Sequence, residues 1–123
     1  MTSAQRTPKE DLLVGGLDDW AAAGWALQSA RLSGETDPVA LRDLTLALIA
    51  GVLNNGLMVA GDVIAGEHVP WHGSAEEVAE RISREWLDEW GEEVPTPGAI
   101  VWLDNTAAGD EIARAVLARE GRE

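Results

Sequence analysis

The sequence predicts an α+β fold that is mostly helical, and three observations lead to this class. Two long stretches repeat apolar side chains at the three-to-four-residue spacing of amphipathic helices. Short apolar runs bounded by glycine, proline and asparagine are typical of strands. Capping residues (Ser, Thr or Asp) precede the helical stretches, and in two of them proline follows at once. Because the chain has 123 residues, all these elements fit one domain.

The expected domain covers residues 8–119. Residues 1–7 are polar and are expected to form a disordered N-terminus, and residues 120–123 a frayed C-terminus. The first ten residues contain no apolar signal-peptide core, and no apolar run approaches the ~20 residues of a membrane span. The sequence therefore predicts a soluble cytoplasmic domain.

Two helices are expected in the first third of the chain. Thr7 and Pro8 form an N-cap followed by proline at the first helical position, which predicts a short helix to about residue 14. A pair of glycines then interrupts the pattern. Asp18 or Asp19 is suited to cap a second helix, expected over residues 18–32.

Asp37 and Pro38 repeat this cap-and-proline signal and begin a third helix. It is expected to end at Asn54, with Gly56 in the left-handed C′ position. Apolar residues cover most of its sides, which is typical of a helix in the centre of a domain. Its main apolar stripe consists of Leu41, Leu44, Leu48 and Val52.

Three strands and a last helix are expected in the remaining apolar segments. Residues 57–64 predict a strand, and residues 67–71 a return strand that Pro70 limits. Residues 99–103 predict a buried strand after a proline-rich connector. Thr106 then caps a helix to about residue 119.

The clearest helix is predicted over residues 74–90. Ser74 and Glu77 have the spacing of a capping box. On the exposed face, three pairs of acidic and basic residues lie four positions apart and are expected to form ion pairs: Glu77 with Arg81, Glu80 with Arg84, and Arg84 with Asp88. The apolar face contains Ala75, Val78, Ala79, Ile82, Trp86 and Trp90.

The charge balance excludes several classes of partner. The chain has 22 acidic and 9 basic residues, a formal net charge of −13. Such a surface repels the phosphates of nucleic acids and anionic lipids, so neither a nucleic acid nor a membrane is expected as a partner. The absence of cysteine excludes disulfides and thiol chemistry. A basic protein is attracted by this charge, although an acidic surface that only aids solubility is the alternative explanation.

The acidic residues concentrate in the second half of the chain. Residues 62–123 account for −10 of the net charge. The densest run contains no basic residue and ends the predicted helix over residues 74–90. We expect this acidic run to bind the partner, with two tryptophans as aromatic contacts. These residues are Glu85, Asp88, Glu89, Glu92 and Glu93, with Trp71 and Trp90.

The tryptophans of the predicted helix allow two interpretations. Trp86 and Trp90 lie one helical turn apart, so they either anchor a partner or continue the apolar face into the core. The second interpretation is favoured, because large aromatic side chains on an apolar helix face are mostly buried. Trp71 follows Pro70 in a loop and is the better candidate for an exposed contact.

One group of side chains suggests metal or acid–base chemistry. Asp62, Glu67, His68 and His72 lie close together in the sequence, and the two histidines have the spacing of helical zinc ligands. Pro70 lies between them and predicts a loop, so this spacing does not bring them together. We therefore expect a solvated loop, with neither metal nor cofactor. An enzyme centred on this group is a third hypothesis, which no nucleophile or phosphate-binding motif supports.

Two stretches of the chain join a helix and a strand through short motifs. In the first, a helix leads through Gly56 and Leu57 into a strand, and in the second a strand leads through Thr106 and Gly109 into a helix. These motifs resemble those of winged-helix regulators, and the resemblance implies a winged-helix-like fold with a helix inserted between the wing strands. Because that helix replaces a short wing and no candidate recognition helix is basic, DNA binding is not implied.

A wider pattern covers about two thirds of the chain. Its residues are Gly56-Leu57, Gly61-Asp62-Val63, Pro70-Trp71, Arg81-Ile82, Trp86, Trp102-Leu103 and Thr106-Ala107-Ala108-Gly109. This pattern is similar to that of a group of small uncharacterised actinobacterial proteins, and the resemblance implies a fold but no established activity.

The sequence thus predicts a non-enzymatic interaction domain that binds a basic protein through its acidic residues. A small, acidic, cysteine-free domain suits an immunity or inhibitor protein for a basic toxin such as a nuclease. The alternative is a degenerate winged-helix regulator or adaptor that acts through protein contacts or as a homodimer.

Overall fold

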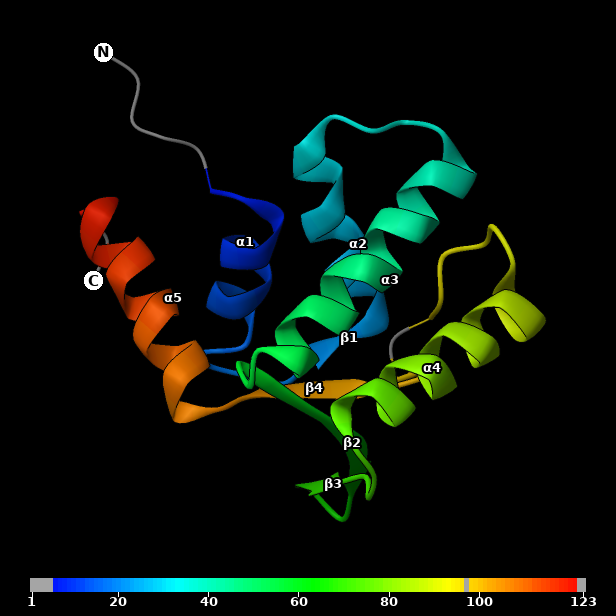
Figure 1. Ribbon diagram of the computed structural model, residues 1–123. Coiled ribbons are helices and arrows are strands. Elements are labelled where there is room, and N and C mark those ends of the chain that lie inside the picture. The colour runs from blue at the N-terminus through cyan, green and yellow to red at the C-terminus, as the bar shows by residue number, and fades with distance from the viewer. Residues whose placement is uncertain (1–5, 97, 122–123) are drawn as a thin grey trace.

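The computed structural model describes residues 6–96 and 98–121 (Figure 1). More than half of these residues are helical and the strands form a single sheet, so the predicted α+β, mostly helical class is confirmed. The elements are α1 (Pro8–Gly15), β1 (Ala21–Ala22), α2 (Ala23–Ala30), the 3₁₀ turn η1 (Arg31–Ser33), α3 (Pro38–Asn54), β2 (Met58–Ile64), β3 (Glu67–Pro70), α4 (Ala75–Glu85), the π-helical turn η2 (Trp86–Trp90), β4 (Trp102–Asn105) and α5 (Ala107–Arg119).

The four strands form an antiparallel sheet in the order β1-β4-β2-β3. β2 and β4 are neighbours in the sheet, although β3 and α4 separate them in the chain. Figure 1 shows the helices gathered on one side of this sheet. Because side chains alternate along a strand, Leu103 and its register partners Ala21 and Ala60 share one buried face. Trp102 and Asp104 therefore point to the opposite face, which the helices leave open.

The central position predicted for the third helix agrees with its packing, since α3 contacts both α2 and α4. Its buried face differs from the predicted stripe. Leu41, Ile49 and Val52 are buried, whereas Leu44 is 41% exposed. Thr45 is fully buried in its place, and its Oγ1 donates to the Leu41 carbonyl at 2.8 Å, which satisfies the hydroxyl.

Helix caps form at four of the predicted positions, which are Thr7, Asp37, Ser74 and Thr106. Ser74 Oγ accepts the Glu77 N–H at 3.1 Å and the Glu77 carboxylate accepts the Ser74 N–H at 3.0 Å, which completes the predicted capping box. This N–H stabilises the carboxylate and lowers the pKa of Glu77 below its ordinary value. Asp37 and Thr106 cap α3 and α5. Each such cap contributes about 1 kcal/mol. Gly56 has φ +69°, which confirms the predicted left-handed position.

The second helix begins later than predicted. Residues 18–20 are not helical, Ala21 and Ala22 pair with β4 as β1, and α2 starts only at Ala23. Asp19 caps no helix, because its Oδ1 accepts the N–H of the adjacent Trp20 at 2.8 Å. The pairing with β4 holds this segment extended, which overrides the local capping signal.

The strand predicted over residues 99–103 is also displaced, since β4 covers Trp102–Asn105. Ile100 has φ +69°, and the Val101 N–H donates to the Ala99 carbonyl at 2.8 Å. These residues form a tight turn before the strand. Ile100 and Val101 in this turn are buried. A buried turn needs apolar side chains, and their run in the sequence resembles that of a buried strand.

The two motifs that carry the winged-helix resemblance contact each other. Thr106 Oγ1 donates to the Gly56 carbonyl at 2.7 Å, and the Thr106 N–H donates to the Leu57 carbonyl at 3.0 Å. A Cβ atom at Gly109 would overlap the same Leu57 carbonyl. These residues therefore hold the start of α5 against the end of α3.

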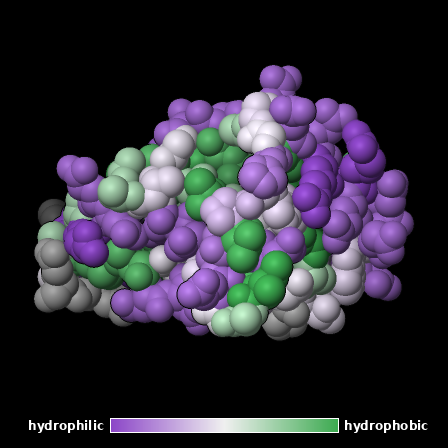
Figure 2. All heavy atoms as spheres, turned by 90° about the horizontal axis from the view of Figure 1, so that it is seen from below, coloured by the Kyte–Doolittle hydropathy of each residue, from purple (hydrophilic) through white to green (hydrophobic). Residues whose placement is uncertain are grey.

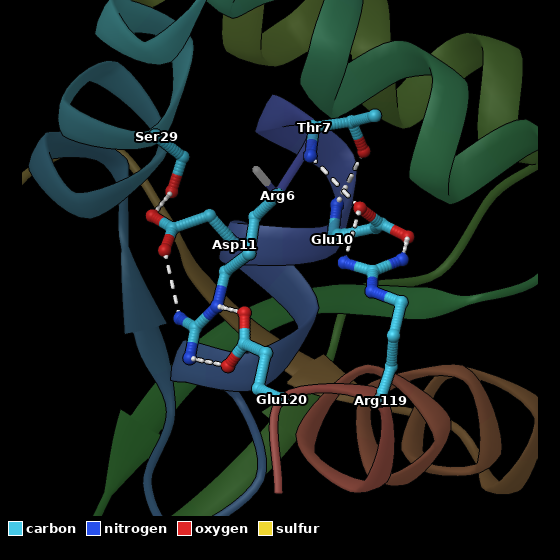
Figure 3. A network of polar contacts seen from close by, with 7 residues as sticks. All are labelled: Arg6, Thr7, Glu10, Asp11, Ser29, Arg119 and Glu120. Carbon is cyan, nitrogen blue, oxygen red and sulfur yellow. Dashed lines mark hydrogen bonds and ion pairs between the residues drawn. The ribbon is translucent and has the colours of Figure 1, made fainter. Parts of the chain in front are cut away.

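A network of charged side chains joins the first and last helices (Figure 3). Arg6 forms a two-pronged ion pair with Glu120, with both N–O distances 2.8 Å, and also bonds Asp11 at 3.0 Å. The hydrogen bonds to Glu120 raise the pKa of the Arg6 guanidinium above its ordinary value. Arg119 bonds Glu10 in the same two-pronged way. These hydrogen bonds lower the pKa of the Glu10 carboxyl.

The same network corrects the expected ends of the domain. Arg6, Thr7 and Glu120 fall in segments predicted to be disordered or frayed, yet each contributes side-chain contacts to the folded molecule. The rest of those predictions falls on residues 1–5 and 122–123, outside the described residues, and on Gly121.

Candidate functional site

The predicted acidic run forms one acidic cluster at the C-terminal end of α4, in η2 and in the loop that follows. Asp88, Glu89, Glu92 and Glu93 are exposed, and Glu85 is partly buried. Within the described part of the chain, none of these five carboxylates has an ion-pair partner. Arg84 was expected to pair with Asp88 as well as with Glu80, but it bonds Glu80 alone, at 2.8 Å. The charges of the acidic cluster are therefore not neutralised within the described structure.

A change of helix type gives the acidic cluster its shape. The predicted helix over residues 74–90 is α-helical only to Glu85 and continues as the wider turn η2. The Gly91 N–H closes this turn on the Trp86 carbonyl at 2.9 Å, and Gly91 has φ +55°. π-Helical turns recur at functional sites, because they change the direction in which consecutive side chains point.

Apolar side chains accompany the acidic cluster. Leu87 is 45% exposed and Val94 48% exposed. Val94 and Glu92 together line a hollow of about 450 Å³ between this loop and the segment that joins α2 to α3. Leu27, Leu41 and Pro38 form much of its remaining wall, and Arg31 and Glu35 supply its other charges.

Trp71 lies at the end of the hairpin and is partly buried against the core. The Arg81 guanidinium carbon stacks 3.6 Å from the centre of its ring, and its indole N–H donates to Asp62 Oδ2 at 2.9 Å. Arg81 was expected to pair with Glu77 instead. One face of the Trp71 ring is thus covered by a side chain of the same molecule.

The other two tryptophans of this region belong to the core to different degrees. Trp86 is fully buried, as the favoured interpretation predicts, and its Nε1 has no hydrogen-bond partner. Trp90 is partly buried and packs against the core. Trp90 therefore lies at the border between the core and the acidic cluster.

The histidine and acidic residues of the hairpin do not gather around one point. Asp62 is held by Trp71, and the His68 Nε2–H donates to the Trp102 carbonyl at 2.9 Å. His72 is exposed beyond the end of β3. Among residues 6–96 and 98–121, no group of three His, Cys, Asp or Glu side chains is arranged to hold a metal ion.

The structure also brings together three tryptophans that the sequence does not predict to form a site. Trp20, Trp25 and Trp102 line a shallow hollow of about 340 Å³ beside the open face of the sheet. Figure 2 views the molecule from below, where apolar patches lie among hydrophilic residues. Trp20 lies in a loop and Trp25 follows it closely in α2, whereas Trp102 lies about 80 positions later, in β4. Only the pairing of β1 with β4, which the sequence did not predict, brings them into one place.

Comparison of the chain with protein-family models, with curated proteins and with solved structures finds no match. The resemblances to winged-helix regulators and to actinobacterial proteins therefore stay predictions. No helix in the described ranges combines the length and the apolar character needed to cross a membrane.

Proposed function

We propose that the protein is a non-enzymatic interaction domain that binds a basic protein through the acidic cluster. The observation that carries this proposal is the set of five carboxylates without an ion-pair partner in the described structure. Charges left in this state attract an oppositely charged partner and raise its rate of association.

The neighbouring apolar residues support binding rather than solubility alone. A surface that only keeps a protein soluble needs charge, but it does not need exposed Leu87 and Val94 beside that charge. Protein interfaces combine an apolar centre with a polar rim. The hollow beside Glu92 and Val94 offers room for an apolar side chain of the partner, with the acidic cluster as the rim.

The partner that fits this chemistry is a basic toxin, for example a nuclease. A nuclease has a positively charged cleft for phosphates, and a row of carboxylates is able to occupy it in their place. The protein is then the immunity or inhibitor protein of that toxin, and its cellular compartment is expected to be the cytoplasm.

The test compares two variants with the same change in charge. One variant is Asp88→Asn, Glu89→Gln and Glu93→Gln in the acidic cluster. The matched control is Glu67→Gln, Glu76→Gln and Glu111→Gln, three exposed acidic residues elsewhere. Each protein is co-expressed with the basic product of a neighbouring gene and purified, and its affinity is measured at several salt concentrations.

We expect the variant of the acidic cluster to lose most of its affinity for the basic partner and most of the salt dependence of that affinity. The control variant is expected to keep both. Equal behaviour of the two variants would contradict it, because binding would then follow the net charge alone. A stable homodimer that binds no neighbouring gene product would favour the regulator or adaptor instead.

A further inference from the structure

Contacts with other parts of the chain adjoin the three tryptophans of the shallow hollow. A Cβ atom at Gly15 would overlap the Trp25 indole, so the absence of a side chain there lets the ring lie against the chain. The Trp20 ring lies 6.4 Å from the His68 ring, measured between centroids. His68 in turn bonds the Trp102 carbonyl at 2.9 Å. A hollow with fixed walls binds a ligand at a lower entropic cost than one that must be ordered first.

Carboxylates adjoin these aromatic walls. Asp19 and Trp20 line both this hollow and a second one of about 310 Å³, which Asp18 and Asp104 also line. Asp19 Oδ1 accepts the Trp20 N–H, which fixes the carboxylate. Among the residues that the structure describes, no basic side chain lines either hollow. Aromatic faces next to unneutralised carboxylates are the surroundings that an organic cation prefers.

The chemistry of the hollow favours an organic cation over a metal ion. The described residues include no group of three side chains suited to a metal, although three aspartates lie near one another here. Indole faces cannot coordinate a hard cation, but they attract a guanidinium or ammonium group.

The molecule already contains one example of the arrangement. Arg81 stacks on Trp71, and Trp71 bonds Asp62. This cluster joins a guanidinium, an indole and a carboxylate. Over the described part of the chain, no other cation lies on a tryptophan ring. The hollow at Trp20, Trp25 and Trp102 therefore has the indoles and the carboxylates without the guanidinium.

We propose that this hollow binds an arginine side chain of a protein partner, with the guanidinium stacked on an indole and paired with Asp19. The planar guanidinium lies flat on aromatic rings and forms two parallel hydrogen bonds with a carboxylate, whereas a lysine ammonium is a compact point charge without this planar geometry. A shallow, open hollow suits a side chain that projects from a larger surface. The hollow is built from other elements than the acidic cluster, so the proposal stands independently of the proposed function.

The test follows the six indole N–H signals of the ¹⁵N-labelled protein by NMR during titration with N-acetyl-arginine methylamide. Salt is held constant, and single Trp→Phe variants assign the signals. We expect the signals of Trp20, Trp25 and Trp102 to shift and that of buried Trp86 to stay. The matched probe is N-acetyl-citrulline methylamide, which has nearly the same shape without the charge and is expected to cause no shift.

Variants of the carboxylates provide a second test, with substitutions that are expected to leave the fold intact. Asp19→Asn retains the Oδ1 that accepts the backbone N–H of Trp20. Together with Asp104→Asn, it removes two negative charges from the hollows. We expect this pair to weaken arginine binding by about fivefold or more. The control pair Glu67→Gln and Glu111→Gln is expected to leave binding unchanged.

Three outcomes would overturn the proposal. The first is the absence of any shift at these three signals. The second is an equal response to citrulline, which would show an apolar contact without recognition of charge. The third is a stronger response to tetramethylammonium than to arginine, which would assign the hollow to alkylated ammonium groups. If only the variant of the acidic cluster lost binding of the basic partner, this result would bear on the proposed function and not on arginine binding by this hollow.

Discussion

At the scale of single residues, Trp86 shows how packing outweighs a polar group. Its side chain is fully buried at the end of α4, and its Nε1–H has no acceptor there. A buried donor without a partner costs about 1–3 kcal/mol. The burial of the large ring outweighs this cost, so Trp86 contributes to stability through its volume.

The first prediction concerns this residue. Trp86→Ala should lower the free energy of unfolding by about 3–5 kcal/mol, since it leaves a large cavity. Trp86→Phe should cost less than half as much, because it fills most of the space and removes the unpaired donor. Urea denaturation of the two variants measures both values. A phenylalanine variant as unstable as the alanine variant would show that the indole N–H contributes to stability.

At the scale of helices and strands, local signals predicted the elements whose ends depend on neighbouring residues in the chain. The caps at Thr7, Asp37, Ser74 and Thr106 are confirmed because a cap is a contact over three residues. β1 and the start of β4 were not predictable in this way. Each depends on pairing between residues about 80 positions apart, which leaves no periodic pattern in so short a strand.

The second prediction compares the same substitution in two helices. Gly51→Ala in α3 should stabilise the protein by about 0.5–1 kcal/mol, because the new methyl group meets no other atom and alanine favours a helix. Gly109→Ala in α5 should destabilise it by about 1–3 kcal/mol, because the methyl group overlaps the Leu57 carbonyl. Thermal unfolding of both variants is the measurement. A Gly109→Ala variant as stable as the unchanged protein would contradict the contact between the Gly56-Leu57 and Thr106–Gly109 motifs.

At the scale of the whole molecule, the charge distribution was predictable but its surroundings were not. The five acidic residues follow from reading the sequence, and so does their lack of basic neighbours in the chain. The sequence did not predict the π-helical turn, nor the hollow beside Glu92, because both depend on how distant segments pack. The hollow lined by three tryptophans was missed for the same reason, although six tryptophans without any Phe or Tyr are a compositional signal for it.

The third prediction follows from the net charge of −13. Repulsion between carboxylates destabilises the compact state, and salt screens it. Raising NaCl from about 20 to about 200 mM should therefore increase Tm by about 2–8 °C, as expected when roughly 1 kcal/mol of repulsion is relieved. Differential scanning fluorimetry measures this shift. The variant with three acidic residues of the cluster neutralised should show a smaller increase, and an equal increase would place the repulsion elsewhere.

The ion pairs that join the first and last helices depend on the order in which the ribosome makes the chain. Arg6 and Glu10 find their partners in Glu120 and Arg119, more than a hundred positions later. Contacts this distant in sequence form late and slow the folding of a domain. On the ribosome, α1 stays without these partners until nearly all of the sheet and the other helices have emerged. The network therefore joins α1 to α5 only after the elements between them have been synthesised.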